Sequence, residues 1–181
     1  MITMLKSMRM RKNGISQDVL PVFEEIVQTY RRDECEGKFM EAMEERLTQE
    51  QRFRLCEQNG SCKGAASDQE RRAFAAEHAD KSLAERLAIF AQAYGRQAVL
   101  NADDTITVTF ACHHGYYKYA PKGTFRFQES LQIYFERCAG GRLYELQKVL
   151  GVKLRMQSVD VSPLRENITN PVIFTFALAD S

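Results

Sequence analysis

The spacing of apolar residues changes near Gly95, and this change limits the folds open to the chain more than any other feature. Before Gly95, apolar residues recur three and four positions apart, which is typical of one face of an α-helix. After Gly95 they alternate, as in residues 105–112, where every second residue from Ile106 is apolar or a cysteine. The sequence therefore predicts helices first and a sheet with one buried face afterwards.

Local signals predict where these elements begin and end. Capping boxes predict helices that begin at Thr48, Ser67 and Ser82. Two further helical segments precede them, at residues 16–32 and 33–47. In the second half, the sequence predicts a helix at 142–150 and strands at 98–101, 105–112, 152–162 and 171–178. Residues 130–137 predict only a helical turn or two, and residues 138–141 predict a glycine turn.

Together these elements predict an α+β fold. Residues 1–95 make up an N-terminal helical part, and residues 96–181 make up an antiparallel β-sheet covered by a helix. A chain of 181 residues that is 44% hydrophobic can bury a substantial core. We therefore expect the two parts to form one compact unit.

The composition excludes some classes of partner. With a net charge of +1, the chain lacks the strongly basic character of a nucleic-acid-binding protein. No stretch is apolar enough to span a bilayer, and the basic N-terminus lacks the apolar core of a secretory signal. We expect a cytoplasmic protein with no nucleic-acid or membrane partner, in a compartment that keeps thiols reduced. The five cysteines are then thiols or metal ligands, with Cys35 at a surface or half-buried position.

The predicted strand at residues 105–112 leads directly into the residues with the most chemistry. The strand ends at Cys112, and His114 would lie on the same face because the two positions differ by two. The tyrosines that follow suit the wall of an apolar pocket, although they would equally suit a core or a homo-oligomer contact. We expect a ligand site between the sheet and this loop, lined by Cys112, His114, Tyr116, Tyr117, Cys138 and Gly141.

Soft metal ligands are concentrated around the same site. If the loop that holds Cys62 reaches across, then Cys62, Cys112, His114 and Cys138 offer three sulfurs and one nitrogen. This is the donor set of a closed tetrahedral zinc site. The spacing matches no zinc signature, because the chain has no Cys-x2-Cys pair. In the alternative, each thiol packs separately, as buried cysteines often do.

The same strand end also fits a catalytic role. An imidazolium next to a thiol lowers the pKa of the thiol, so His114 could activate Cys112 as a nucleophile. Backbone N–H groups at the start of the predicted helix 142–150 could hold an oxyanion, with Gly141 as a donor. The simpler explanation for the glycines is that they permit a tight turn.

The order of motifs over residues 53–178 resembles an uncharacterised prokaryotic family of small cysteine-rich domains. In that family a helical Cys-Gly-Arg-x-Cys element precedes a strand ending in Cys-x-Cys, and a cysteine–glycine turn then opens a helix. Cys62 and Cys112 match cysteines of the first two motifs, and Cys138 with Gly141 matches the turn. His114 stands where the second cysteine of the strand-end motif would be, which keeps a metal ligand at that position.

The chain departs from this family at three other cysteines. Glu136 and Val172 stand where the family has cysteines, and Cys56 is displaced from the first position of the helical element. The family is in turn similar to 4-vinyl-reductase-like ligand-binding domains and to the L-2-amino-thiazoline-4-carboxylic acid hydrolase family. The resemblance therefore implies either a ligand-binding domain or a hydrolase.

Three functions are consistent with these observations. The first is a small-molecule-binding or sensor domain with a Cys/His-lined pocket. If these side chains hold a metal ion, we expect it to be zinc. The second, implied by the resemblance, is a hydrolase of a small cyclic amidine or thiazoline-like substrate that uses Cys112 and His114. The third is a helical interaction module without chemistry. We favour the first, and the sequence leaves open whether the protein is an enzyme.

Overall fold

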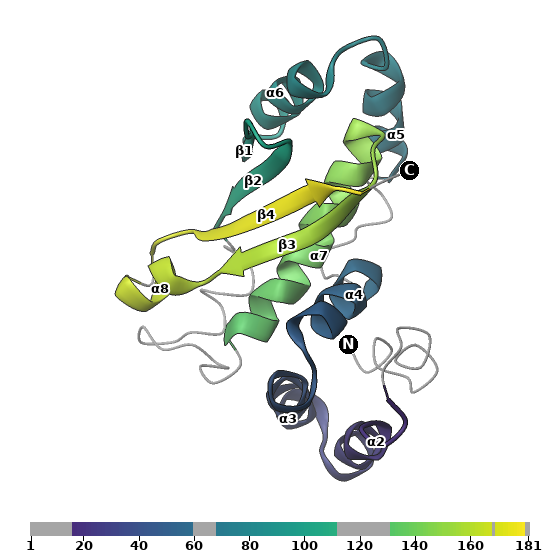
Figure 1. The fold of residues 1–181 in the computed structure, drawn as a ribbon, viewed down its shortest axis with the longest axis vertical. Helices are drawn as coiled ribbons and strands as arrows, with labels where there is room; N and C mark the ends of the chain where they lie inside the picture. Colours follow the sequence, from purple (N-terminus) through teal and green to yellow (C-terminus); the bar gives the residue numbers. More distant parts are fainter. Residues whose placement is uncertain (1–15, 60–67, 112–130, 168, 180–181) are drawn as a thin grey trace.

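The computed structural model describes residues 16–59, 68–111, 131–167 and 169–179. Helices fill the described chain before Gly95, as the sequence predicts (Figure 1). They are α2 (Leu20–Thr29), α3 (Arg32–Arg46), α4 (Gln49–Asn59), α5 (Asp68–Glu77) and α6 (Leu83–Ala93). The first of these is shorter than the predicted helix at 16–32, because Tyr30 adopts an extended backbone that separates α2 from α3.

The described residues after Gly95 form an antiparallel four-stranded sheet, so the predicted α+β class is confirmed. The strands lie in the spatial order β1-β2-β4-β3. They are β1 (Gln97–Leu100), β2 (Thr105–Phe110), β3 (Leu154–Asp160) and β4 (Val172–Leu178). The predicted hairpin is β1–β2, and a short helix, α8 (Ser162–Glu166), joins β3 to β4.

One long helix, α7 (Leu131–Leu150), runs through the centre of the fold. It packs against β3 and β4 of the sheet and also against α4 and α5 (Figure 1). Its apolar residues, among them Phe135 and Leu146, form the main core together with Phe174 and Phe176 of β4. Because α7 is covered on opposite sides, several of its charged side chains are buried as well.

The glycine turn predicted at residues 138–141 is wrong, because α7 continues through Gly140 and Gly141. A glycine inside a helix costs about 1 kcal/mol relative to alanine. Burial of one Leu or Phe side chain contributes about 1.5–3 kcal/mol, and α7 buries many of them. Packing therefore outweighs the local preference for a turn.

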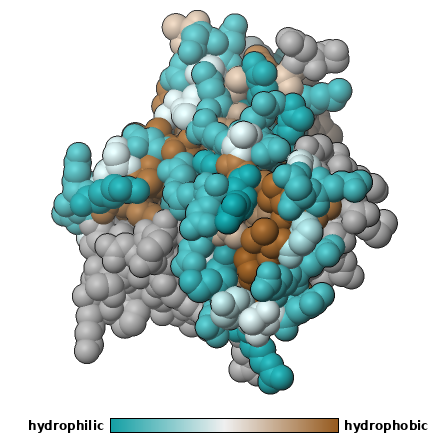
Figure 2. All heavy atoms as spheres, turned by 60° about the horizontal axis from the view of Figure 1, so that its bottom comes forward, coloured by the Kyte–Doolittle hydropathy of each residue, from teal (hydrophilic) through white to brown (hydrophobic). Residues whose placement is uncertain are grey.

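A second apolar cluster holds the N-terminal helices together. Phe23 of α2, Phe39 of α3 and Leu55 of α4 pack with Ile133 of α7. The ring centroids of Phe23 and Phe39 are 4.5 Å apart. Figure 2 looks towards this end of the molecule, where apolar residues reach the surface between hydrophilic ones. Since α7 also contributes to the main core, it is shared by the two apolar clusters.

Side-chain caps begin two helices at the predicted residues. At Thr48, the Gln51 N–H donates to Thr48 Oγ1 at 3.3 Å, and the Thr48 N–H donates to Gln51 Oε1 at 2.9 Å. At Ser82, the Glu85 N–H donates to Ser82 Oγ at 3.3 Å, and Glu85 Oε2 accepts from the Ser82 N–H at 2.8 Å. The third predicted cap, Ser67, lies outside the described residues.

Candidate ligand-binding site

The described part of the chain contains two of the predicted site residues, Cys138 and Gly141, and both are buried in α7. The other predicted residues, Cys62, Cys112, His114, Tyr116 and Tyr117, lie outside the described residues. The predicted role of Gly141 as an oxyanion donor is wrong, because this residue is in the interior of a helix rather than at its start. An amide in a helix interior donates to the carbonyl four residues earlier.

The described thiols are buried. Cys35 is 2% exposed, so its predicted surface or half-buried position is wrong, and its Sγ lies 3.8 Å from the carbonyl oxygen of Ile26. Cys56 is fully buried, and this burial, together with the nearby Glu136 carboxylate, raises its pKa. A thiol of that kind is a poor nucleophile at neutral pH. Within the described ranges, no three His, Cys, Asp or Glu side chains are grouped so that they could hold a metal ion.

A set of charged residues adjoins Cys138 on α7. Arg142 and Glu145 follow Cys138 at helical spacings of four and seven residues, so all three lie on one side of the helix. Arg142 Nη1 donates to Glu145 Oε2. Two further arginines contact the same carboxylate: Arg96 Nη2 lies 3.4 Å and Arg71 Nη2 lies 3.9 Å from Glu145 Oε1. We call Arg71, Arg96 and Arg142 the arginine cluster.

The arginine cluster is largely enclosed. Arg71, Arg142 and Glu145 are each less than 9% exposed, whereas the side chain of Arg96 is 40% exposed. Arg142 Nε is buried and has no hydrogen-bond partner within the described part of the chain. Together with Asp68, which pairs with Arg71 at 3.3 Å, the cluster brings three positive and two negative charges into direct contact.

The end of β2 lies against this part of α7. The guanidinium carbon of Arg142 is 5.6 Å from the centroid of the Phe110 ring, which is a favourable cation–π distance. Phe110 is the last residue of β2 and precedes Cys112 by two positions. This contact joins the end of β2 to Arg142, one turn of α7 beyond Cys138.

The start of α5 is tied to the same part of α7. Tyr144 Oη lies 2.8 Å from Asp68 Oδ2 and 3.0 Å from Oδ1. This hydrogen bond lowers the pKa of Asp68 and raises the pKa of Tyr144. Asp68 is the first residue of α5 and follows Cys62 by six positions. Asp68 and Phe110 therefore both contact α7 between Cys138 and Glu145.

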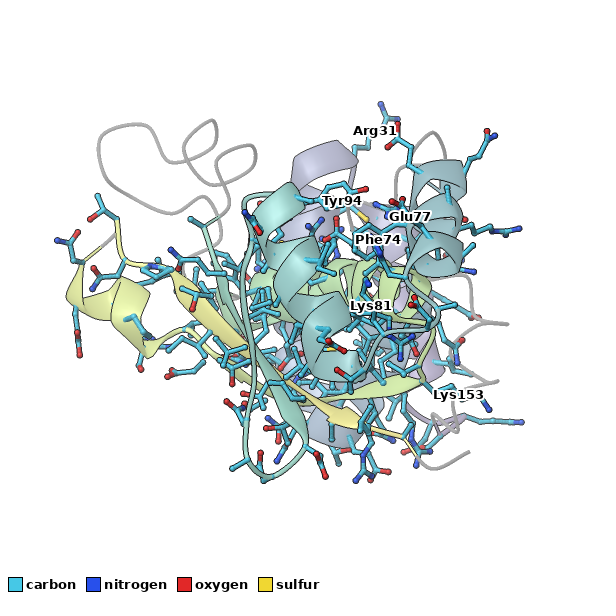
Figure 3. The ribbon with its side chains drawn as sticks, turned by 90° about the horizontal axis from the view of Figure 1, so that it is seen from above. Arg31, Phe74, Glu77, Lys81, Tyr94 and Lys153 are labelled. Carbon is cyan, nitrogen blue, oxygen red and sulfur yellow. The ribbon has the colours of Figure 1, made fainter. Side chains whose placement is uncertain are left out.

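Aromatic packing holds α5, which supplies Arg71, against α6, which precedes Arg96 in the chain. Phe74, one turn after Arg71, lies between α5 and α6 with its ring 6.0 Å from Tyr94, and the two side chains lie close together in Figure 3. Gly95 ends α6 with a φ of +60°, which few other residues adopt. The Arg96 N–H then donates to the carbonyl of Ala91 at 2.8 Å. This helix end fixes the backbone from which Arg96 reaches Glu145.

A separate buried ion pair lies between α7 and α4. Glu136 is fully buried, and Arg52 Nε and Nη2 donate to its two oxygens at 3.0–3.3 Å. Gln132 Nε2 donates to the same carboxylate at 3.3 Å. Burial raises the pKa of Glu136, although Arg52 opposes that shift. Because this pair is closed off by packed helices, we interpret it as structural.

The raised pKa of Glu136 predicts a specific pH dependence of stability. In the folded state Glu136 holds its proton more tightly than in the unfolded chain, where the pKa is about 4.3. Protonation therefore favours folding, and this contribution is lost as the pH rises above about 4.3 through the folded-state pKa. The stability of the wild type relative to Glu136→Gln should decrease over that range. Urea unfolding of both proteins from about pH 4 to pH 7 measures this difference in stability. A difference that increases with pH would contradict a raised pKa for Glu136.

Sequence reasoning missed the arginine cluster. At Arg142 and Glu145 the sequence does give a weak indication of buried charge, because these two residues interrupt the apolar side of α7. Arg71 and Arg96 carry none, since each lies in a polar stretch that is typical of an exposed helix face or turn. The burial of Arg71 and the contact of Arg96 with Glu145 depend on how α5 and α6 pack, which no local pattern specifies.

Comparison of the chain with protein-family models, with curated proteins and with solved structures found no match. None of the helices in the described ranges has both the length and the apolar character needed to cross a membrane. What the site does has to be inferred from its own chemistry. That chemistry consists of a buried thiol, three guanidinium groups around one carboxylate, and an aromatic ring at the end of a strand.

Proposed function

We propose that the protein is a small-molecule-binding domain, and that its ligand binds where the end of β2 meets α7. The observation that carries this proposal is the contact of Phe110 with Arg142, one turn of α7 beyond Cys138. The pocket would be lined by Cys138 and Gly141 of α7 and by Cys112, His114, Tyr116 and Tyr117.

The charges at this position support binding more strongly than a purely structural role. Buried charges cost several kcal/mol unless they are paired and hydrogen-bonded. The Glu136–Arg52 pair meets that requirement, because both carboxylate oxygens accept hydrogen bonds from Arg52. In the arginine cluster, by contrast, the Nε of Arg142 is buried without a hydrogen-bond partner among the described residues. Perturbed and incompletely satisfied groups of this kind are typical of functional sites.

A zinc ion is an additional proposal at the same place. The attachment of Asp68 and Phe110 to α7 supports a meeting of Cys62, Cys112 and His114 with Cys138. Three thiolates and one imidazole would form a closed tetrahedral site, and metal binding would then contribute to folding. Zinc in stoichiometric amount in protein purified without a histidine tag would support this proposal. Metal-free protein that stays folded in a strong chelator would exclude it.

The binding proposal predicts the effect of Tyr116→Ala. A library of small molecules is first screened for an increase in melting temperature, and the affinity of the strongest binder is measured by calorimetry. Removal of a pocket-lining aromatic ring should weaken that affinity by about tenfold or more, while the melting temperature of the free protein stays nearly unchanged. Tyr30→Ala, at the end of α2, is the matched control and should leave the affinity unchanged. A large loss of stability in Tyr116→Ala would instead make Tyr116 a core residue and contradict the pocket.

A further inference from the structure

We infer that two copies of the chain associate through the outer edge of β1, so that their sheets join into one. This inference concerns a protein partner rather than the ligand site, so it does not depend on the proposed function. It is carried by a difference between the two edges of the sheet. Side chains close one edge, whereas the other presents an exposed valine and backbone groups that point away from the sheet.

β3 forms the edge that is closed, because side chains of the helices bond to its outward backbone groups. The N–H of Leu154 donates to Gln147 Oε1 at 2.9 Å, and the N–H of Met156 donates to Glu57 Oε1 at 2.7 Å. A side chain of α7 also donates to the carbonyl of Val159, at 3.0 Å. A further strand could pair with β3 only by displacing these hydrogen bonds.

β1 forms the opposite edge, and its pairing with β2 shows which of its backbone groups point outward (Figure 1). The Asn101 N–H donates to the Thr105 carbonyl at 2.8 Å, and bonded pairs recur at every second residue of an antiparallel ladder. Val99 is therefore bonded to β2, whereas the N–H and C=O groups of Ala98 and Leu100 are directed away from it. In the described part of the chain these outward groups have no hydrogen-bond partner.

The side chains around β1 are typical of a contact surface rather than of a protected edge. Among the described residues, the large hydrophobic side chains that are exposed are Tyr94, at 40%, and Val99, at 61%. Val99 lies in β1, and Tyr94 ends α6 shortly before β1 begins. Natural proteins prevent pairing at an edge strand with charged residues or proline. The β1 sequence, Gln-Ala-Val-Leu, contains neither.

A second copy of β1 fits this edge in an antiparallel arrangement. In the register that satisfies the outward groups, Ala98 of each copy exchanges hydrogen bonds with Leu100 of the other. This register places Val99 of one copy opposite Val99 of the other, across a two-fold axis. Directly opposed residues that do not bond to each other have the closest side chains in an antiparallel pair. The exposed valines therefore cover one another.

The charges at the two ends of β1 also favour a second copy as the partner. Arg96 precedes β1, and its side chain is 40% exposed. The turn that follows β1 carries Asp103 and Asp104, which are both exposed. Because antiparallel strands run in opposite directions, Arg96 of one copy approaches the acidic turn of the other, and the contact is repeated on the other side of the axis. The edge is thus complementary to itself in hydrogen bonding and in charge.

Sedimentation velocity of the full-length protein, from about 1 μM to about 1 mM, measures the association. Because β1 has four residues, the interface is small and the dimer should dissociate within this range. Val99→Lys places like charges opposite each other and should raise the dissociation constant by about tenfold or more. The matched control is Gln157→Lys, which adds the same charge at an exposed position of β3 and should change the dissociation constant by less than about twofold.

A second variant detects the contact directly and does not depend on an added charge. In Val99→Cys the new thiols of two copies face each other at a distance that a disulfide can span. With copper phenanthroline as the oxidant, this variant should give a covalent dimer on a non-reducing gel. Gln157→Cys and the wild type, which contains the native thiols, should give far less.

Three results would overturn the inference. The first is a protein that stays monomeric over the whole concentration range, even if β1 then proves to bind a strand of a different protein. The second is a dimer that Val99→Lys leaves intact, because its interface would lie elsewhere. The third is cross-linking of Val99→Cys that does not exceed that of Gln157→Cys.

Discussion

Replacement of Arg52 by alanine is expected to destabilise the protein by about 3–5 kcal/mol, because it leaves the carboxylate of Glu136 buried without a counter-ion. Glu136 is fully buried between α7 and α4. Arg52 also donates from Nη1 to the carbonyl of Leu47 at 2.9 Å, so the substitution removes a link between the end of α3 and α4 as well. Urea unfolding at neutral pH measures the loss.

The chain provides a matched control for Arg52→Ala one half-turn further along the same helix. Arg54 pairs with Glu50 on the surface of α4, where the two side chains are 58% and 73% exposed. Exposed ion pairs of this kind contribute about 0–1 kcal/mol, so Arg54→Ala should change stability little. Replacement of both Arg52 and Glu136 by apolar residues should recover much of the loss, because no buried charge remains. Equal effects of Arg52→Ala and Arg54→Ala would contradict the buried pair.

Replacement of Glu145 by alanine is expected to destabilise the protein by a similar amount, about 3–5 kcal/mol. The substitution removes the carboxylate that Arg71, Arg96 and Arg142 share, and Arg71 and Arg142 are buried. Thermal and urea unfolding measure the change. Because an added monocarboxylate can replace the missing charge, benzoate should stabilise Glu145→Ala more than it stabilises the wild type.

Glu50→Ala is the control for this prediction, since Glu50 pairs with a single exposed arginine. It should change stability by less than about 1 kcal/mol and should show no added response to benzoate. A stable Glu145→Ala protein would mean that the three guanidinium groups do not need a counter-ion. The ion pairs around Glu145 would then contribute little to folding.

Local signals in the sequence were sufficient for much of the fold. Thr48 and Ser82 begin helices because their hydroxyl groups can accept from the N–H three residues later, and this depends only on neighbouring residues. The alternation of Ile106 and Val108 predicts β2 for a similarly local reason, since strand side chains point to opposite faces in turn.

Features that depend on tertiary packing could not be predicted in this way. Gly140 and Gly141 favour a turn on their own, and they become helical because α7 is covered by the sheet and by α4 and α5. Cys35 has charged neighbours in sequence, yet it is buried where α3 packs against α2. For the same reason the sequence could not show that Arg71 and Arg96 contact Glu145 of α7.

The distance between Cys112 and Cys138 tests the central claim, which is that the chain beyond β2 meets the Cys138 face of α7 to form one site. Dibromobimane bridges two thiols only when they come within a few ångströms, and mass spectrometry of the digested protein identifies the bridged pair. Monobromobimane, which labels single thiols, is the control for access to each cysteine. We predict a Cys112–Cys138 bridge in the native protein and none between Cys112 and Cys35. Labelling of both Cys112 and Cys138 by monobromobimane without any bridge between them would contradict the proposed site.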